Sequence, residues 1–236
     1  MNILNKSVKC PFCDVPNLEH IIDREGPIIL LKNKFPVLQR ANQTVLIETD
    51  QCESELSLYP KAHLHKLFRF AIHHWLNFNK DNHYKSVILF KNHGPFSGGS
   101  LSHPHSQITG FEEIDYRDKV TLTDFQGITI DKSGDVELTL STHPRVGFYE
   151  YNVTMKHLSS IASFAEYTQI AVHYILNHFP FNINSYNLFF YQMDDTIYVK
   201  IVPRYVTTPL FIGYSIPQVA NNLSELVSDM KRIYFK

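Results

Sequence analysis

The chain has 236 residues, of which 44% are hydrophobic and 19% are charged, a composition that favours a folded globular protein over a disordered one. Its formal net charge is −1 with histidine neutral, which argues against a general affinity for nucleic acid. The sequence contains no run of about 18 apolar residues, so we expect no membrane span. Because the first residues form no apolar leader, the cytoplasm is the expected location.

The first half of the chain alternates strand-like and helix-like patterns. Apolar runs predict strands over residues 28–32 and 44–48. Apolar residues at three- and four-residue steps then predict a helix over 61–79. Two further strands, over 86–91 and 105–111, flank a loop rich in glycine and serine. The predicted order is therefore strand, strand, helix, strand, strand.

The second half repeats this order in weaker form. A final helix is predicted over about 217–234, because Ser215 and Pro217 suit the cap and first-turn positions of a helix. The repetition predicts two related halves of α+β class, with antiparallel sheets and packed helices. The other elements predicted for this half are strands over 126–131, 135–140 and 147–153, a helix over 157–177, and strands over 186–191 and 195–203.

Cys10 and Cys13 form a C-x-x-C pair, a spacing at which two thiolates chelate one Zn²⁺. A structural zinc takes four ligands. The remaining cysteine, Cys52, is the third candidate, and His103 is preferred to His93 as the fourth. A cytoplasmic location favours thiols or metal ligands over disulfides. The alternatives are three unrelated cysteines, or a redox dithiol, which is typical of a βαβ context that the N-terminal segment lacks.

The stretch Phe90–Gln107 is the most informative part of the sequence. It reads as a strand, a loop of small residues and a second strand that opens with His-Pro-His-x-Gln. Glycine and serine let backbone N–H groups approach an anion closely, and a neutral imidazole at His105 can attack phosphorus near pH 7. Lys91 is expected either to attract phosphate or to be exposed. The alternative interpretation is a tight strand connection with chance histidines, since the chain has 13.

This hairpin resembles the signature of galactose-1-phosphate uridylyltransferases, a branch of the histidine-triad (HIT) superfamily built as a tandem repeat of two related halves. The resemblance extends to the C-x-x-C pair and to Asn33–Leu38, which is similar to the nucleotide-binding segment of the family. Small bacterial relatives of the family look closest. The resemblance implies a HIT-like tandem repeat. It divides the chain into a zinc-binding segment (1–27), a first half with the catalytic hairpin (28–112) and a second half (126–236), with a linker near 113–125.

The resemblance also implies roles for individual residues. His105 matches the nucleophile that becomes nucleotidylated, and Gln107 matches a residue that hydrogen-bonds the transferred phosphate. His103 matches a zinc ligand, whereas Cys52 stands where well-known members carry histidine, which would give a Cys₃His zinc site. The remaining matches are to substrate-binding residues, with Asn33 and Phe35 at the base and ribose, and Asn92, Gly98, Gly99 and Ser100 at the phosphates.

The activity implied by the resemblance is transfer of a nucleoside monophosphate from a nucleotide sugar to a sugar 1-phosphate or to phosphate, through a covalent intermediate on His105. Zinc is the implied cofactor, and a nucleotide sugar and a sugar phosphate are the implied partners. No nucleic acid or membrane partner is expected, and the chain is expected to be a monomer or a homodimer. Two alternatives stay open, a nucleotide hydrolase and a catalytically idle, zinc-stabilised module that binds a nucleotide or a protein.

Overall fold

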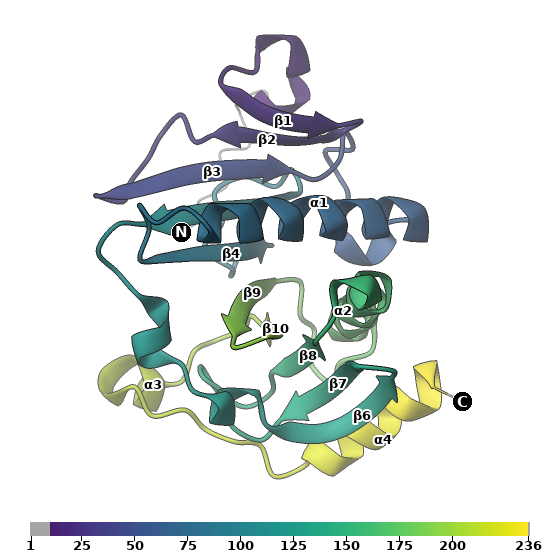
Figure 1. The fold of residues 1–236 in the computed structure, drawn as a ribbon. Helices are drawn as coiled ribbons and strands as arrows, with labels where there is room; N and C mark the ends of the chain where they lie inside the picture. Colours follow the sequence, from purple (N-terminus) through teal and green to yellow (C-terminus); the bar gives the residue numbers. More distant parts are fainter. Residues whose placement is uncertain (1–9, 236) are drawn as a thin grey trace. The chain divides into compact units, whose positions relative to one another are not determined.

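The structure, a computed structural model, describes residues 10–235. The chain divides into two compact units (Figure 1), here called unit 1, which ends at Lys119, and unit 2, which begins at Val120. The division falls inside the charged stretch near 113–125, which forms two short 3₁₀ turns, Tyr116–Lys119 and Leu122–Phe125. No helix in the described part of the chain combines the length and the apolar character needed to cross a membrane.

Unit 1 is a five-stranded antiparallel sheet with one long helix. The strands lie in the order β1-β2-β3-β5-β4. Strand β1 was not predicted from the sequence, because all five of its residues are exposed and it therefore lacks an apolar pattern. The elements in chain order are β1 (Ile21–Glu25), β2 (Ile28–Lys32), β3 (Ala41–Ile47), α1 (Lys61–Asn79), β4 (Ser86–His93) and β5 (His105–Phe111).

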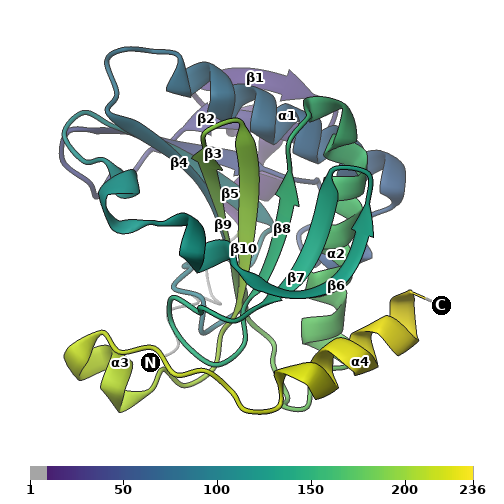
Figure 2. The ribbon, with the colours of Figure 1, turned by 60° about the horizontal axis from the view of Figure 1, so that its bottom comes forward.

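Unit 2 has the same connectivity and the corresponding strand order, β6-β7-β8-β10-β9, again antiparallel throughout (Figure 2). The predicted fold class, α+β with two related halves, antiparallel sheets and packed helices, is therefore confirmed. The elements are β6 (Gly127–Ser133), β7 (Val136–Ser141), β8 (Tyr151–Met155), α2 (Ile161–Asn177), β9 (Tyr186–Met193), β10 (Thr196–Pro203), α3 (Pro209–Tyr214) and α4 (Leu223–Tyr234).

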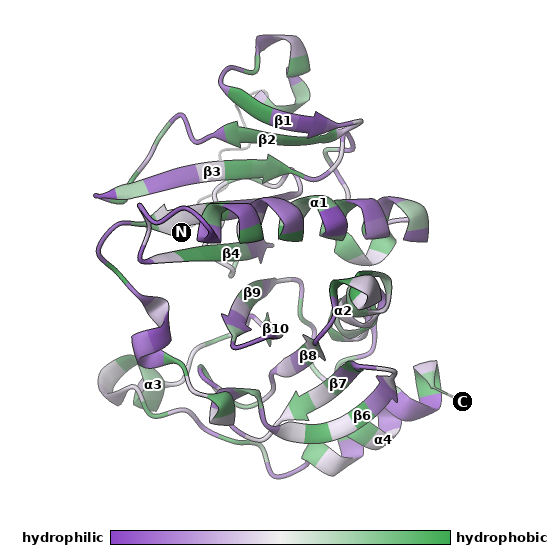
Figure 3. Ribbon diagram, viewed as in Figure 1, coloured by the Kyte–Doolittle hydropathy of each residue, from purple (hydrophilic) through white to green (hydrophobic). Residues whose placement is uncertain are grey.

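Strand β2 and the second half of β3 have consecutive hydrophobic residues (Figure 3), because both faces of the sheet are covered there. On one face, α1 buries its predicted apolar side, and Trp75 Nε1 donates to the Val87 carbonyl oxygen at 2.8 Å. On the other face, the N-terminal segment packs Phe12, Val15 and Leu18 against a buried cluster of β2 and β3 side chains, Ile29, Leu31, Val45 and Ile47. This second face also carries the candidate site.

The predicted start of the last helix is wrong. Helix α4 begins at Leu223, with Asn222 as its cap residue. Residues 215–222 are not helical, because Val219 instead forms a bridge with Phe148, far away in the sequence. Val219 is 52% exposed, so it does not belong to the apolar face that α4 buries, which consists of Leu223, Leu226, Val227 and Met230. The short helix α3 was not predicted either.

Asp135, in the turn between β6 and β7, ties that turn to the segment before α2. Its carboxylate accepts hydrogen bonds from the N–H groups of Lys156 and His157, at 3.0 and 2.7 Å, and from the Ser160 hydroxyl. The hydrogen bond from Ser160 has the largest effect, and together these bonds lower the pKa of Asp135 from an ordinary 3.8 to about 2. The ionised carboxylate therefore anchors the start of the helical segment in unit 2.

We expect Asp135→Ala to lower the free energy of unfolding by about 1 kcal/mol near neutral pH, as loss of a helix cap does. The pKa of Asp135 is lower in the folded protein than in the unfolded chain. Its stabilisation is therefore complete at pH values above its ordinary pKa, and it is lost as the pH falls through the folded-state pKa. Urea unfolding of both proteins at about pH 6 and about pH 3 measures the difference. A difference that grows on acidification would contradict the assignment.

Candidate active site and metal centre

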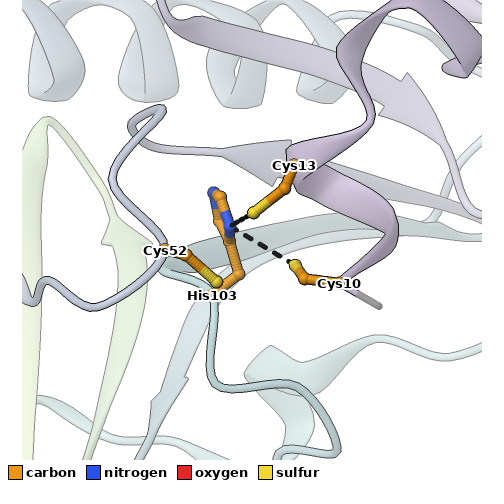
Figure 4. A group of neighbouring side chains, drawn as sticks. All are labelled: Cys10, Cys13, Cys52 and His103. Carbon is orange, nitrogen blue, oxygen red and sulfur yellow. Dashed lines mark hydrogen bonds between the residues drawn. The ribbon is translucent and has the colours of Figure 1, made fainter. Parts of the chain in front are cut away.

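Cys10, Cys13, Cys52 and His103 come together in unit 1 (Figure 4), with their ligand atoms all within 4.8 Å of one another. Three separate segments supply them. Cys10 is the cap residue of the 3₁₀ turn Pro11–Cys13, and Cys13 is its last residue. Cys52 lies in the loop after β3, and His103 precedes β5. The structure therefore brings His103, and not His93, together with the three cysteines.

The donor set and its spacing fit zinc. The Nδ1 atom of His103 lies 3.5 Å from the Cys10 sulfur and 3.6 Å from the Cys13 sulfur. A tetrahedral zinc holds sulfur and nitrogen ligands about 3.6 Å apart. Burial, followed by the neighbouring thiols of Cys13 and Cys10, raises the pKa of Cys52 to about 12. A divalent cation would supply the positive charge that three thiolates at this separation require.

The backbone at Thr49 fixes which nitrogen of His103 faces the sulfurs. His103 Nε2 lies 2.8 Å from the Thr49 carbonyl oxygen. A carbonyl only accepts hydrogen bonds, so Nε2 carries the proton and Nδ1 offers its lone pair to the cluster. A metal-ligating histidine is commonly oriented by such a bond on its other ring nitrogen. The side chain is 1% exposed, and its orientation is therefore strongly constrained.

The same reasoning assigns the tautomer of His105. Its Nδ1 atom lies 2.7 Å from the carbonyl oxygen of His103, so Nδ1 carries the proton and Nε2 is left with a lone pair. Burial lowers the pKa of His105, although the bond to His103 opposes the shift. The ring is thus neutral near pH 7, which is the form that can act as a nucleophile.

The sheet register places Gln107 and Asn92 on the same face as His105. In the antiparallel ladders, His105 pairs with Ile47 of β3 and Gln107 pairs with Phe90 of β4. Directly paired residues share a face, and side chains two residues apart in a strand also do. Asn92, two residues after Phe90, therefore belongs to this face too. Phe12 packs edge-on against His105, with ring centroids 5.5 Å apart.

The loop between β4 and β5 is shaped by its glycines. Gly98 has φ +86°, which a side chain would strain. A Cβ on Gly99 would lie 3.2 Å from the Asn92 Cβ, so the loop folds back closely over that residue. The N–H groups of Ser97 and Gly99 are used inside the loop, by the Gly94 carbonyl and the Ser97 hydroxyl. Within residues 10–235, the N–H groups of Gly98 and Ser100 have no such acceptor inside the loop.

The segment between β2 and β3 carries Asn33 and Phe35, away from the hairpin in the sequence. The Asn33 side chain accepts from the Phe35 N–H at 3.0 Å, and Gln43 Oε1 accepts from the N–H groups of Val37 and Leu38 at 2.8 Å. The segment is thus held at both ends while Phe35 remains 76% exposed. Within the described part of the chain, residues 10–235, no direct contact places Asn33 or Phe35 beside His105.

The expectation that Lys91 is exposed is wrong. Its side chain is 1% exposed and forms an ion pair with Glu48, with 2.8 Å between Nζ and Oε2. Glu48 was not singled out in the sequence, because it lies 43 positions from Lys91 and no local motif links them. His93 lies on β4, outside the cysteine cluster, where burial and then the charge of Lys91 lower its pKa to about 4.

Two family models match the chain, and both belong to DUF4931, a domain of unknown function. The model of its N-terminal domain matches residues 1–114, and the model of its C-terminal domain matches residues 117–235. The crystal structure of a DUF4931 family protein from Bacillus cereus ATCC 10987 is similar, with 46% sequence identity and a TM-score of 0.84 over 92% of this chain and 100% of that chain. None of the curated proteins compared with the chain matches it.

More distant solved structures share the fold. A GalT-like protein from Arabidopsis thaliana has 17% identity and a TM-score of 0.78, over 94% of this chain and 90% of that one. An ADP-glucose phosphorylase from Arabidopsis thaliana, with bound ADP-glucose, has 14% identity and a TM-score of 0.79, over 97% and 90%. At these identities the likeness concerns the fold alone, and it confirms the predicted GalT-like fold.

Proposed function

Since the chain belongs to the DUF4931 family, we propose that members like it transfer a nucleoside monophosphate from a nucleotide sugar to phosphate or to a sugar 1-phosphate. The observation that carries this proposal is the tautomer of His105. The bond from its Nδ1 to the His103 carbonyl, 2.7 Å long, leaves Nε2 as the nucleophilic atom. The ADP-glucose bound to a relative of the same fold supports a nucleotide sugar as donor.

In the first half of the reaction, the Nε2 lone pair of His105 attacks the α-phosphorus of the nucleotide sugar. A nitrogen–phosphorus bond forms, and the bond from the α-phosphorus to the bridging oxygen breaks. The sugar 1-phosphate leaves with that bonding pair. The proton on Nδ1 stays on His105, and the His103 carbonyl stabilises the positive charge that the ring acquires.

In the second half, an oxygen of phosphate or of a sugar 1-phosphate attacks the same phosphorus. The nitrogen–phosphorus bond breaks, and its electron pair returns to His105, which is then ready for another cycle. Negative charge on the transferred group needs stabilisation throughout. The N–H groups of Gly98 and Ser100, with the side chains of Gln107 and Asn92, are assigned this task.

We assign Cys10, Cys13, Cys52 and His103 as the ligands of a structural zinc. A complete set of four protein ligands leaves no open position for substrate, so the chemistry that zinc supplies is orientation of the site. His103 would then link the metal to the nucleophile, because its ring would bind the metal and its carbonyl accepts a hydrogen bond from His105.

The two halves of the chain have different tasks in this proposal. Residues 1–27 serve as the zinc-binding segment, of which 1–9 lie outside the described residues, and 28–112 form the catalytic half. In the second half, 126–236, only Asp194 and Asp195 separate β9 from β10, so the loop that faces the phosphate in unit 1 has no counterpart. We therefore assign one catalytic centre to the chain.

The proposal is tested by incubating the zinc-loaded full chain with ADP-glucose, UDP-glucose or UDP-galactose, with and without phosphate or a sugar 1-phosphate. We expect sugar 1-phosphate to be released steadily only when an acceptor is present. Steady release of nucleoside monophosphate without an acceptor would replace transfer by hydrolysis. Binding of these sugars without any product would overturn the enzymatic proposal and leave the idle binding module.

A further inference from the structure

Unit 1 contains a buried ion pair on the sheet face opposite to His105. Glu48, directly after β3, and Lys91, on β4, are each 1% exposed, and 2.8 Å separates Glu48 Oε2 from Lys91 Nζ. The hydroxyls of Ser106 and Tyr59 also donate to the Glu48 carboxylate, at 2.5 and 2.9 Å. Burial alone would raise the pKa of Glu48, but the charge of Lys91 and these hydrogen bonds lower it, so the Glu48 carboxylate is ionised.

Stability by itself does not account for this arrangement. Lysine and glutamate are rarely buried completely, because desolvation opposes most of the attraction between the charges. Replacing a buried ion pair by apolar residues of similar volume is often neutral or stabilising. A buried pair of this kind therefore suggests a geometric task, and its neighbours indicate which one.

Three contacts from the Glu48–Thr49 segment converge on the residues around His105. The Glu48 N–H donates to the carbonyl of Pro104, the residue before His105, at 3.1 Å. The Glu48 carboxylate accepts from Ser106, the residue after His105. The Thr49 carbonyl accepts from the ring of His103, whose own carbonyl bonds to His105. The backbone on both sides of the nucleophile is thus attached to one short segment.

Lys91 gives that segment a fixed position. It lies on β4, whereas Glu48 follows β3, and β5 runs between these two strands. Lys91 pairs directly with Ser106 in the β4–β5 ladder. The ion pair therefore spans the strand that begins with His105, and connects its two neighbours on the side away from the site.

We propose that Glu48 is a positioning residue, which with Lys91 holds the His103–Ser106 segment so that His105 keeps one ring orientation and one tautomer. The expected effect of this positioning on turnover rests on the proposed function. Glu48 and Lys91 lie on the opposite face of the sheet from Gln107 and Asn92, so they do not contact substrate. A loss of positioning should therefore lower kcat and leave KM nearly unchanged.

The test uses the double variant Glu48→Gln/Lys91→Met in the full, zinc-loaded chain. Both charges are removed together, so no unpaired charge remains in the interior. Unit 2 offers a matched control, Glu150→Gln/Lys200→Met, because Glu150 and Lys200 form another ion pair that is completely buried, 3.1 Å long. Glu48→Asp, which keeps the charge but shortens the side chain, serves as a second variant if the double variant folds poorly.

Two readouts are taken. Nitrogen-15 NMR of histidine-labelled protein reports the tautomer of His105, and steady-state kinetics report kcat and KM. We expect the double variant to lose the single Nδ1–H tautomer and to show a kcat about 10- to 100-fold lower, the penalty of a displaced reacting group, while the control resembles the wild type. An unchanged tautomer and kcat would overturn the inference. If the wild type itself shows no turnover, the proposed function fails, and the tautomer alone decides this inference.

Discussion

The variant His105→Gln is expected to release sugar 1-phosphate at about 10⁻⁴ of the wild-type rate or less, the order of loss that follows removal of a covalent nucleophile. Glutamine has an amide in place of the imidazole and offers no nitrogen lone pair to phosphorus. Since His105 is only 7% exposed and contacts Phe12, glutamine is chosen to retain volume. Initial rates with saturating nucleotide sugar and phosphate give the measurement.

His83→Gln is the matched control for this prediction. His83 lies in unit 1 and is exposed, and its Nε2 atom contacts Glu112 at 3.2 Å, away from the hairpin. Its rate should equal that of the wild type. Zinc content and the thermal midpoint of His105→Gln should also remain close to those of the wild type. A His105→Gln rate within about tenfold of wild type, with normal zinc content, would remove His105 from the mechanism.

The second large effect concerns the metal. Cys13→Ser, or a strong chelator, is expected to release zinc and to lower the midpoint of thermal unfolding by about 10 °C or more. A structural zinc contributes roughly 10 kcal/mol or more to folding in small domains, which is comparable to the whole stability of a domain. The cluster joins the N-terminal segment, the loop after β3 and the start of β5. Loss of the metal is therefore also expected to loosen the segment that positions His105.

Asn17→Ser is the control for the metal prediction. Asn17 is exposed and lies in the same N-terminal segment, where its amide donates to Asp14 at 3.1 Å, but it is not part of the cluster. Elemental analysis and calorimetry of the three proteins supply the measurement. Purified wild-type protein without zinc, or a Cys13→Ser midpoint equal to that of Asn17→Ser, would contradict the structural role of the metal.

Local patterns in the sequence predicted the elements that have a regular buried face. Helix α1 has the predicted bounds, 61–79, because its apolar spacing reflects the burial of one face. Strand β5 also has its predicted bounds, 105–111, although Ile108 and Phe111 are its only large apolar residues. Strand β1 was missed since its exposed residues have no such spacing. The start of α4 was misplaced because a contact between Val219 and Phe148 overrides the local helix signals.

The residues of the candidate site likewise fall into those that the sequence predicts and those that it does not. Residues with chemical signatures, the cysteines and the His-Pro-His-x-Gln element, were identified from the sequence, and the structure places Cys10, Cys13, Cys52 and His103 in one cluster. The supporting role of Glu48 and Lys91 was not predicted. Glu48 and Lys91 have ordinary charged side chains in the sequence, and their burial depends on the pairing of β3, β5 and β4, which no local pattern records.

The central claim, a covalent nucleotide on His105, is tested most directly by mass spectrometry of the protein quenched in alkali after mixing with a nucleotide sugar in the absence of acceptor. Alkaline quenching protects nitrogen–phosphorus bonds on histidine. We expect one nucleoside monophosphate per chain, located on the peptide that contains His105, and its disappearance when phosphate or a sugar 1-phosphate is added. Continued turnover with no adduct, or an adduct on another residue, would contradict the mechanism.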